Sequence, residues 1–367
     1  MTTNQRDHAD APVVEGRDLP SQGTRVTAAL PRSPLHLRLL RQAGVTPDVV
    51  LYRDAHLADH MTPGERGRAK FLGREQRWPG GSLRRVRAAN TAYYRSVRQT
   101  VSQWRYARLI LFLESEPLEN CVRDAVGDAV VELWEEGLSH YADFHGPAYD
   151  HLRSAVQLAA GFYPRRIFHR RADRRGFARV CDRFVHGGLP VAPPVAAAAN
   201  PAMHDAALLI GAPLIQDRLV SRRRYINAIE WITVNLRQPV VYYAHPREDT
   251  RPLADLETVF GRAWFRIRPN TADVAAHVAQ NRYQCYLAAF STALLDVAPF
   301  GPAAFCPALF GLHRVHRQLD RLDFLPARVI ATWPDLTAFS EDAQARAHGP
   351  LRADDAASHE PASEIAA

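Results

Sequence analysis

Three short stretches of this 367-residue chain carry side chains that could do chemistry. The first is Glu135-Glu136-Gly137, which directly follows the apolar run AVVELW (129–134). Two neighbouring carboxylates repel each other, which favours proton uptake by a partly buried one and suits it to general-base catalysis. The glycine lets the backbone turn sharply after the strand. The competing interpretation is a solvated acidic turn.

The second stretch is His245-Pro246, at the end of the apolar run PVVYYA (239–244). A histidine leaving a strand, followed by a proline suited to the first turn of a helix, can offer an imidazolium and free backbone N–H groups to a phosphate. Arg247 adds another cation. The alternative is an ordinary surface turn.

The third stretch is Ser291-Thr292, which lies between CYLAAF (285–290) and the apolar run ALLDVA (293–298). Hydroxyls at the start of a helix cap its free N–H groups, and the same geometry binds phosphate oxygens. Capping is the role that either residue alone would have in any protein.

These stretches must be positioned by strands that alternate with helices. The predicted strands of the first half are RVTAAL (25–30), DVVLY (48–52), ARLILFL (107–113) and AVVELW (129–134). Helical patterns lie between them, including one from the N-cap Ser33 to Gly44 and one over 82–104. The second half repeats the alternation, with strands in 206–214, 239–246, 264–269 and 327–331 and a helix over 222–237. This order predicts two parallel sheets covered by helices.

A change of composition separates the two halves. The stretch HGGLPVAPPVAAAANP (186–201) has no amphipathic period and is typical of an interdomain linker. We therefore predict a disordered N-terminus (1–24), a first Rossmann-like domain (25–190), a linker (191–201), a second domain (202–340) and a disordered tail (341–367). Loops at the carboxyl ends of both sheets would converge on a cleft between the domains and place a ligand there.

Composition limits the class of protein. Hydrophobic residues make up 47% and charged residues 23%, which is ordinary globular usage. The 46 basic and 39 acidic side chains give a net charge of +7, which favours an anionic partner. The four cysteines show no metal-ligand or disulfide spacing, so we expect a cytoplasmic protein without structural zinc. No apolar run reaches the length of a membrane span, so any membrane contact would be peripheral.

The order of the three stretches, each after an apolar run, resembles the bacterial sialyltransferases and polysialyltransferases. That family carries an Asp/Glu-Asp/Glu-Gly motif, a His-Pro motif and a Ser/Thr pair. The opening strand followed by SPL (33–35), and IGAPL (210–214) ahead of a tyrosine-containing helix, are also similar. The resemblance spans about residues 25 to 335 through short motifs.

The resemblance implies a GT-B glycosyltransferase with two Rossmann-like domains, parallel sheets and an interdomain cleft. It implies inverting transfer of a CMP-activated sialic acid, without a metal or other cofactor, to a glycan or glycolipid acceptor, as in the synthesis of capsule or cell-surface polysaccharide. Glu135 would take the proton of the acceptor hydroxyl, and Glu136 and Gly137 would shape its loop. His245 would stabilise the CMP phosphate. The remaining implied nucleotide contacts are Gly211, Pro246, Arg247, Ser291 and Thr292.

Two positions depart from the family pattern. Related enzymes often carry lysine two places before the histidine, where this chain has Tyr243. An acidic residue expected after the next strand has no counterpart unless Asp273 supplies it. Both positions bear on nucleotide contacts, so the donor could instead be another CMP-linked nonulosonic or ulosonic acid such as Kdo.

The arginine-rich stretch YPRRIFHRRADRRGFAR (163–179) has three interpretations: a solvated helix face, a surface for an anionic glycan or lipid headgroups, and a nucleic-acid site. We favour glycan or membrane over nucleic acid, because no nucleic-acid-binding motif accompanies it. The main functional alternative is a non-catalytic polyanion- or nucleotide-binding protein of glycosyltransferase ancestry. The sequence does not define an oligomeric state.

Overall fold

The structure is a computed structural model. It describes residues 18–21, 23–76, 82–135, 137–164, 182–185, 198–269 and 274–348. The chain forms two compact units: unit 1 comprises Met1–Val195 and Leu312–Leu325, and unit 2 comprises Ala196–Gly311 and Pro326–Ala367. Each unit is described by itself.

Unit 1 is built on sheet A, whose six strands are all parallel. Its order, β3-β2-β1-β4-β5-β6, is that of a Rossmann fold. The strands are β1 (Arg25–Leu30), β2 (Val49–Tyr52), β3 (Ala69–Phe71), β4 (Arg105–Leu111), β5 (Val130–Trp134) and β6 (Arg183–Val185). The helices are α1 (Pro34–Gln42), α2 (Pro63–Gly67), α3 (Leu83–Val101), α4 (Pro117–Ala125), α5 (Pro147–Ala159) and α10 (His313–Leu319).

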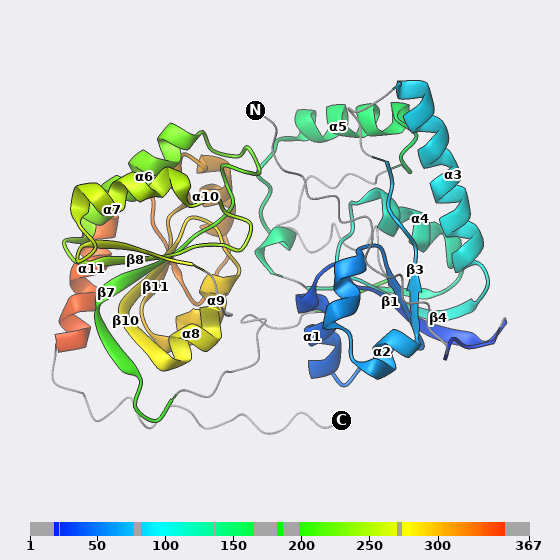
Figure 1. Cartoon of the computed structure of the whole chain (residues 1–367), viewed down its shortest axis with the longest axis horizontal. Coiled ribbons are helices and arrows are strands. Elements are labelled where there is room, and N and C mark those ends of the chain that lie inside the picture. Colours follow the sequence, from blue (N-terminus) through cyan, green and yellow to red (C-terminus); the bar gives the residue numbers. More distant parts are fainter. Residues whose placement is uncertain are drawn as a thin grey trace. The chain divides into compact units, whose positions relative to one another are not determined.

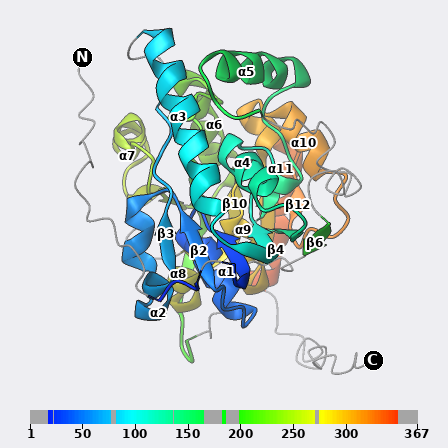
Figure 2. The same ribbon diagram turned by 90° about the vertical axis from the view of Figure 1, so that its right-hand side faces the viewer.

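Both faces of sheet A are covered, because neighbouring residues of a strand point to opposite sides. Ala28 and Leu30 of β1 belong to a core that also contains residues of α3 and α4, whereas Ala29 packs with α1 on the other face. Figure 2 shows α3 and α4 side by side over the sheet. The near-continuous apolar strands read in the sequence follow from this two-sided burial.

Unit 2 repeats the design in sheet B, whose order is β12-β11-β10-β7-β8-β9, again all parallel. Numbered from β7, this is the strand order of sheet A. Figure 1 shows helices on both faces of the sheet. The strands are β7 (Ala202–Ile210), β8 (Val240–Tyr243), β9 (Phe265–Arg268), β10 (Asn281–Ala288), β11 (Ala303–Phe305) and β12 (Arg328–Val329). The helices are α6 (Arg222–Leu236), α7 (Ala254–Phe260), α8 (Val274–Gln280), α9 (Ala293–Val297) and α11 (Trp333–His348).

Two boundaries differ from those expected. The segment Leu312–Leu325, which includes α10, packs with unit 1 rather than continuing the second domain. The prediction of a disordered tail from 341 is wrong over 341–348, which completes α11. This helix is anchored by the buried side chains of Leu336, Phe339 and Ala343, and the Ser340 hydroxyl donates to the Leu236 carbonyl at 2.9 Å. Within 341–348 the buried anchor is the small side chain of Ala343, so this last part of the helix carries little apolar signal in the sequence.

Candidate functional site

The carboxyl edge of sheet B collects the residues that the sequence singled out in the second half. Ile210 at the end of β7 pairs with Tyr243 of β8 on one side and with Ala288 of β10 on the other. Gly211, His245 and Ser291 therefore follow three adjacent strands at nearly the same level. The strand order reverses between β7 and β10, and this topological switch point is where open parallel sheets bind ligands.

The loop that begins at His245 is a turn and does not start a helix. The Glu248 N–H donates to the His245 carbonyl at 2.9 Å, and the next helical segment is a 3₁₀ turn over Arg251–Leu253 that leads into α7 at Ala254. The expectation that Pro246 opens a helix whose N–H groups meet a phosphate is therefore wrong. The turn is closed by Glu248, whose carboxylate folds back and accepts the His245 N–H.

Glu248 is held by two buried tyrosines. Tyr225 of α6 and Tyr242 of β8 donate to its Oε1 at 2.9 and 2.5 Å, and their own hydroxyls lie 2.6 Å apart. The other oxygen accepts the N–H of His245 at 3.2 Å. Burial raises the pKa of Glu248, and its hydrogen bonds oppose that shift. This Tyr225–Tyr242–Glu248 network fixes the backbone of the His245 turn.

Gly211 is required by the same network. A Cβ at this position would contact the Glu248 carboxylate and lie 2.6 Å from the Tyr242 hydroxyl oxygen. A side chain here would push the network out of place. The glycine predicted as a nucleotide contact thus also has a packing role.

His245 is half-buried, and its ring orientation is defined. Its Nδ1 accepts the Arg247 N–H at 3.1 Å, which leaves the other ring nitrogen, Nε2, to carry the proton of the neutral form. The pKa of His245 is lowered, chiefly by burial and then by the charge of Arg247, while Asp217 opposes the shift. The Arg247 guanidinium ion-pairs with Asp217 at 3.2 Å. It is therefore not an uncompensated cation.

Ser291 and Thr292 precede α9, as the sequence predicts for a helix starting after β10. Thr292 is the N-cap residue, but its side chain makes no capping hydrogen bond. The Leu294 and Leu295 N–H groups instead donate to the backbone carbonyls of Ser291 and Thr292. Both residues are half-buried, so their hydroxyls lie at the edge of the sheet rather than in the core.

The departure at Tyr243 has a structural reason. Its side chain is buried and its ring stacks on His277 of α8, with the ring centroids 5.1 Å apart. Burial, together with the charges of Arg268 and His204, lowers the pKa of His277 to about 4, so this histidine is neutral at physiological pH. An aromatic residue at position 243 completes the core.

The carboxyl edge of sheet A carries the acidic candidates. Glu135 follows β5 and is only 3% exposed, more buried than expected, and the Tyr141 hydroxyl donates to its Oε1. Gly137 has φ 136°, a conformation that a residue with a side chain rarely adopts. Glycine at the third position of the motif is thus explained by the backbone. Glu136 lies outside the described residues.

Other polar residues follow neighbouring strands at this edge and were missed. Arg32, after β1, ion-pairs at 2.6 Å with Glu119 in the first turn of α4. Burial raises the pKa of Glu119 to about 7, although Arg32 opposes the shift. Glu114 follows β4, and its Oε2 lies 3.8 Å from Nδ1 of His140. The signal that could have found Glu114 is the one used for Glu135, a polar residue directly after an apolar strand.

Some predictions concern residues that the structure does not describe. These are Glu136, Asp273, Cys181, residues 165–179 of the arginine-rich stretch, and the parts 1–17, 22, 191–197 and 349–367 of the predicted disordered ends and linker. The described cysteines are buried and free: Cys121, Cys285 and Cys306. Within the described ranges, three or more His, Cys, Asp or Glu side chains never gather in a way that could hold a metal ion. No helix in the same ranges is long and apolar enough to cross a membrane.

Comparisons with known proteins concern the fold. No family model and no curated protein matches the sequence. Arabidopsis thaliana UGT89C1 complexed with UDP-L-rhamnose is 14% identical, with a TM-score of 0.51 over 88% of this chain and 90% of that chain. A ugt transferase from Siraitia grosvenorii in complex with UDP is 10% identical, with a TM-score of 0.50 over 88% of this chain and 92% of that one.

At these identities the likeness defines the architecture. The chain has the GT-B fold of two Rossmann-like α/β units, as predicted. The expectation that Glu135 and His245 face each other across an interdomain cleft depends on how the units sit relative to each other, so it stays a prediction.

Proposed function

We propose that this protein is a glycosyltransferase that uses a nucleotide-activated sugar as donor and a hydroxyl of a glycan as acceptor. The observation that carries the proposal is the meeting of Gly211, His245 and Ser291-Thr292 at the switch point of sheet B. The GT-B fold is the second support.

The edge of sheet B suits a leaving phosphate. Because Nδ1 of His245 accepts a backbone N–H, its Nε2–H is available to donate to a phosphate oxygen. The hydroxyls of Ser291 and Thr292, after the next strand but one, are further donors. Preorganised donors stabilise the charge that develops as the bond between sugar and phosphate breaks. The network around Glu248 keeps His245 in place during this step.

We assign the proton transfer to Glu135. The acceptor oxygen attacks the anomeric carbon, the bond to the donor phosphate breaks, and the acceptor proton goes to the Glu135 carboxylate. Attack opposite the leaving group inverts the anomeric centre. Since Tyr141 already donates to Glu135, the acceptor must bind beside this pair, and Tyr141 orients the carboxylate.

A CMP-linked nonulosonic acid is our proposed donor, and the motif pattern is its support. One phosphate needs few counter-charges, which fits an edge with one histidine and two hydroxyls. A second candidate is a UDP-linked sugar, because two solved structures with a similar fold hold UDP-L-rhamnose or UDP.

A thermal-shift series with CMP, UDP and GDP distinguishes the donors. Binding to the native state raises the melting temperature, so CMP should stabilise the protein and the diphosphates should not. His245→Ala should abolish the shift, while Arg262→Ala, which changes an exposed arginine of unit 2, should retain it. If UDP alone raised the melting temperature, the proposed donor would be a UDP-linked sugar and not a CMP-linked one. Nucleotide binding without release of nucleotide from any donor and acceptor pair would make the protein a non-catalytic binder.

A further inference from the structure

Helix α5 of unit 1 exposes its apolar side chains and, apart from the exposed His151, turns its polar ones toward the protein. Leu152 is 65% and Val156 44% exposed, and Tyr149 and Leu158 are exposed as well. On the opposite arc Asp150, Arg153, Ser154 and Gln157 are half-buried, and Arg153 lies 3.5 Å from Glu116. A surface helix normally has the reverse orientation. The outward arc of α5 therefore lacks the partner that its residues require.

Helix α3, against which α5 ends, is uniformly cationic. Its 19 residues include Arg84, Arg85, Arg87, Arg95 and Arg98 and no acidic residue. Arg87, Arg95 and Arg98 are exposed and have no ion-pair partner among the described residues. The exposed charges of a helix are usually of mixed sign, so this surface is suited to an anionic partner.

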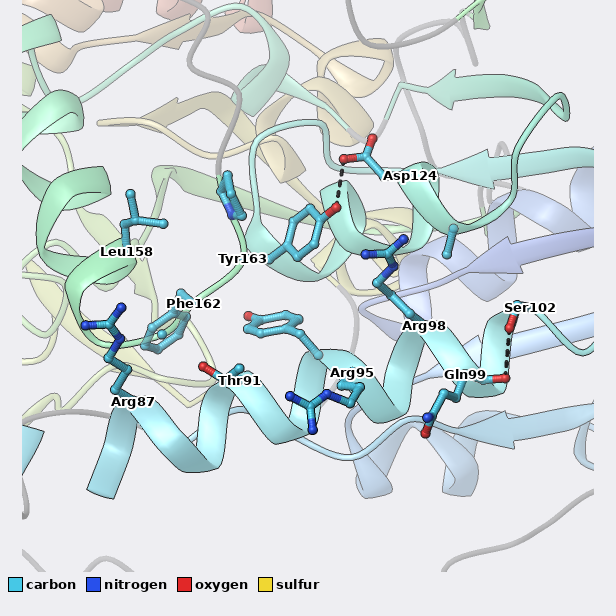
Figure 3. A pocket seen from close by; sticks show the side chains of 14 residues that line it. Arg87, Thr91, Arg95, Arg98, Gln99, Ser102, Asp124, Leu158, Phe162 and Tyr163 are labelled. Atoms are coloured by element: carbon cyan, nitrogen blue, oxygen red, sulfur yellow. Dashed lines mark hydrogen bonds between the residues drawn. The ribbon is translucent and has the colours of Figure 1, made fainter. Parts of the chain in front are cut away.

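The two surfaces meet in one groove of about 640 Å³. Arg87, Arg95 and Arg98 line one wall, and Leu158 of α5 lines the groove with Phe162 and Tyr163 (Figure 3). Gly161, after α5, packs so closely on the Arg87 backbone that a Cβ would not fit. Tyr94 also lines the groove, and its buried hydroxyl has no hydrogen-bond partner among the described residues. The apolar arc of α5 is thus continuous with a groove whose charged lining is three arginines and one carboxylate, Asp124.

We propose that this surface docks the protein on an anionic phospholipid bilayer. The outward arc of α5 enters the interface between headgroups and acyl chains, and the groove arginines bind the phosphates of the headgroups. An apolar helix face flanked by arginines has the chemistry of a peripheral membrane anchor. A purely polar anion would not need the apolar arc, and a purely apolar partner would not need the arginines. The proposal does not depend on which sugar the protein transfers.

Co-sedimentation of the full chain with vesicles tests the proposal. We expect binding to vesicles of equal parts phosphatidylcholine and phosphatidylglycerol, and none to phosphatidylcholine alone. Arg87→Gln, Arg95→Gln and Arg98→Gln together should weaken binding about a hundredfold, because each arginine near an anionic membrane contributes a factor of about five. Leu152→Ser with Val156→Ser should weaken it at least tenfold, since apolar burial is lost.

Matched controls lie in unit 2. Arg237→Gln, Arg251→Gln and Arg262→Gln remove the same charge from arginines that already face carboxylates. Val234→Ser with Val259→Ser changes two side chains that are 52% and 72% exposed. Both controls should bind like the wild type, and the melting temperature of every variant shows that it is folded.

Three results would overturn the proposal. If the wild-type protein does not co-sediment with anionic vesicles, membrane docking is excluded. Loss of binding in the arginine variant but not in the Leu152/Val156 variant would define a polyanion surface instead. Conversion of an oligomer into a monomer by the Leu152/Val156 variant in sedimentation velocity would make the arc a contact between copies of the chain.

Discussion

The carboxyl edges of the two sheets share a strand order but carry opposite chemistry. In sheet B the edge presents an imidazole and hydroxyls, and the carboxylate of Glu248 is turned inward by two tyrosines. In sheet A the edge holds the buried carboxylates Glu114, Glu119 and Glu135. The same strand order therefore carries hydrogen-bond donors at one edge and buried carboxylates at the other. The division of labour lies in the loops, not in the fold.

The largest effect should separate the two edges in activity. Glu135→Ala should reduce turnover about a thousandfold, because general-base catalysis contributes factors of this order, and leave nucleotide affinity unchanged. His245→Ala should weaken both nucleotide affinity and turnover. Steady-state kinetics and calorimetric titration with the nucleotide measure the two quantities. If both variants lost the same nucleotide affinity, Glu135 could not be assigned to the acceptor rather than to the nucleotide.

The next effect concerns the pH dependence of stability in unit 1. The folded-state pKa of Glu119 is raised to about 7, above its ordinary value of 4.5, so the folded protein binds the proton more tightly than the unfolded chain. This residue should therefore cost stability as pH rises from about 4.5 to 7, by up to about 3 kcal/mol. Glu119→Gln should flatten the curve of unfolding free energy against pH over that window, measured by urea denaturation. An unchanged slope would show that Arg32 holds the carboxylate ionised.

A smaller effect should arise at Gly211. Gly211→Ala puts a methyl group against Glu248 and the Tyr242 hydroxyl, which we expect to cost about 1–3 kcal/mol and to displace the His245 turn. Chemical denaturation and the CMP-induced shift in melting temperature measure the two consequences. Gly261→Ala is the control for strain alone, because Gly261 has φ 75° and a Cβ there meets nothing within 4 Å. If Gly211→Ala binds the nucleotide like the wild type, the Tyr225–Tyr242–Glu248 network does not position His245 for binding.

The smallest effect sharpens the role of Glu248. Glu248→Gln keeps the shape and leaves one acceptor for the two tyrosines, so stability should change by about 1 kcal/mol or less. Glu248→Ala leaves the buried hydroxyls of Tyr225 and Tyr242 without this acceptor and should cost about 1–3 kcal/mol. If both variants bind the nucleotide like the wild type, the network stabilises the fold but does not hold His245 in place for binding.

Much of the architecture was predictable. The strand 25–30 and the helix 222–237 match β1 and α6, because their apolar runs and periods are unbroken over the whole element. The short strands β3, β6, β11 and β12 give weaker signals, and three of them were missed. Three residues are too few to show a period. They form strands because a neighbouring strand offers its hydrogen-bonding edge.

The site was predictable in part. The rule that polar residues directly after apolar strands are candidates selected Glu135 and His245, and it would also have selected Glu114, whereas Pro31 separates Arg32 from its strand. The inward turn of Glu248 was not predictable, since it depends on how Tyr225 of α6 packs beside Tyr242 of β8, which local patterns of residues do not encode.

By itself the sequence determined the alternation of strands and helices, since buried parallel strands and amphipathic helices differ in their apolar period. It also determined which polar residues follow which strands. Only the tertiary structure decided the strand order, the inward turn of Glu248 and the outward apolar arc of α5. These features depend on packing between segments far apart in the chain, and local patterns of residues do not encode which segments meet.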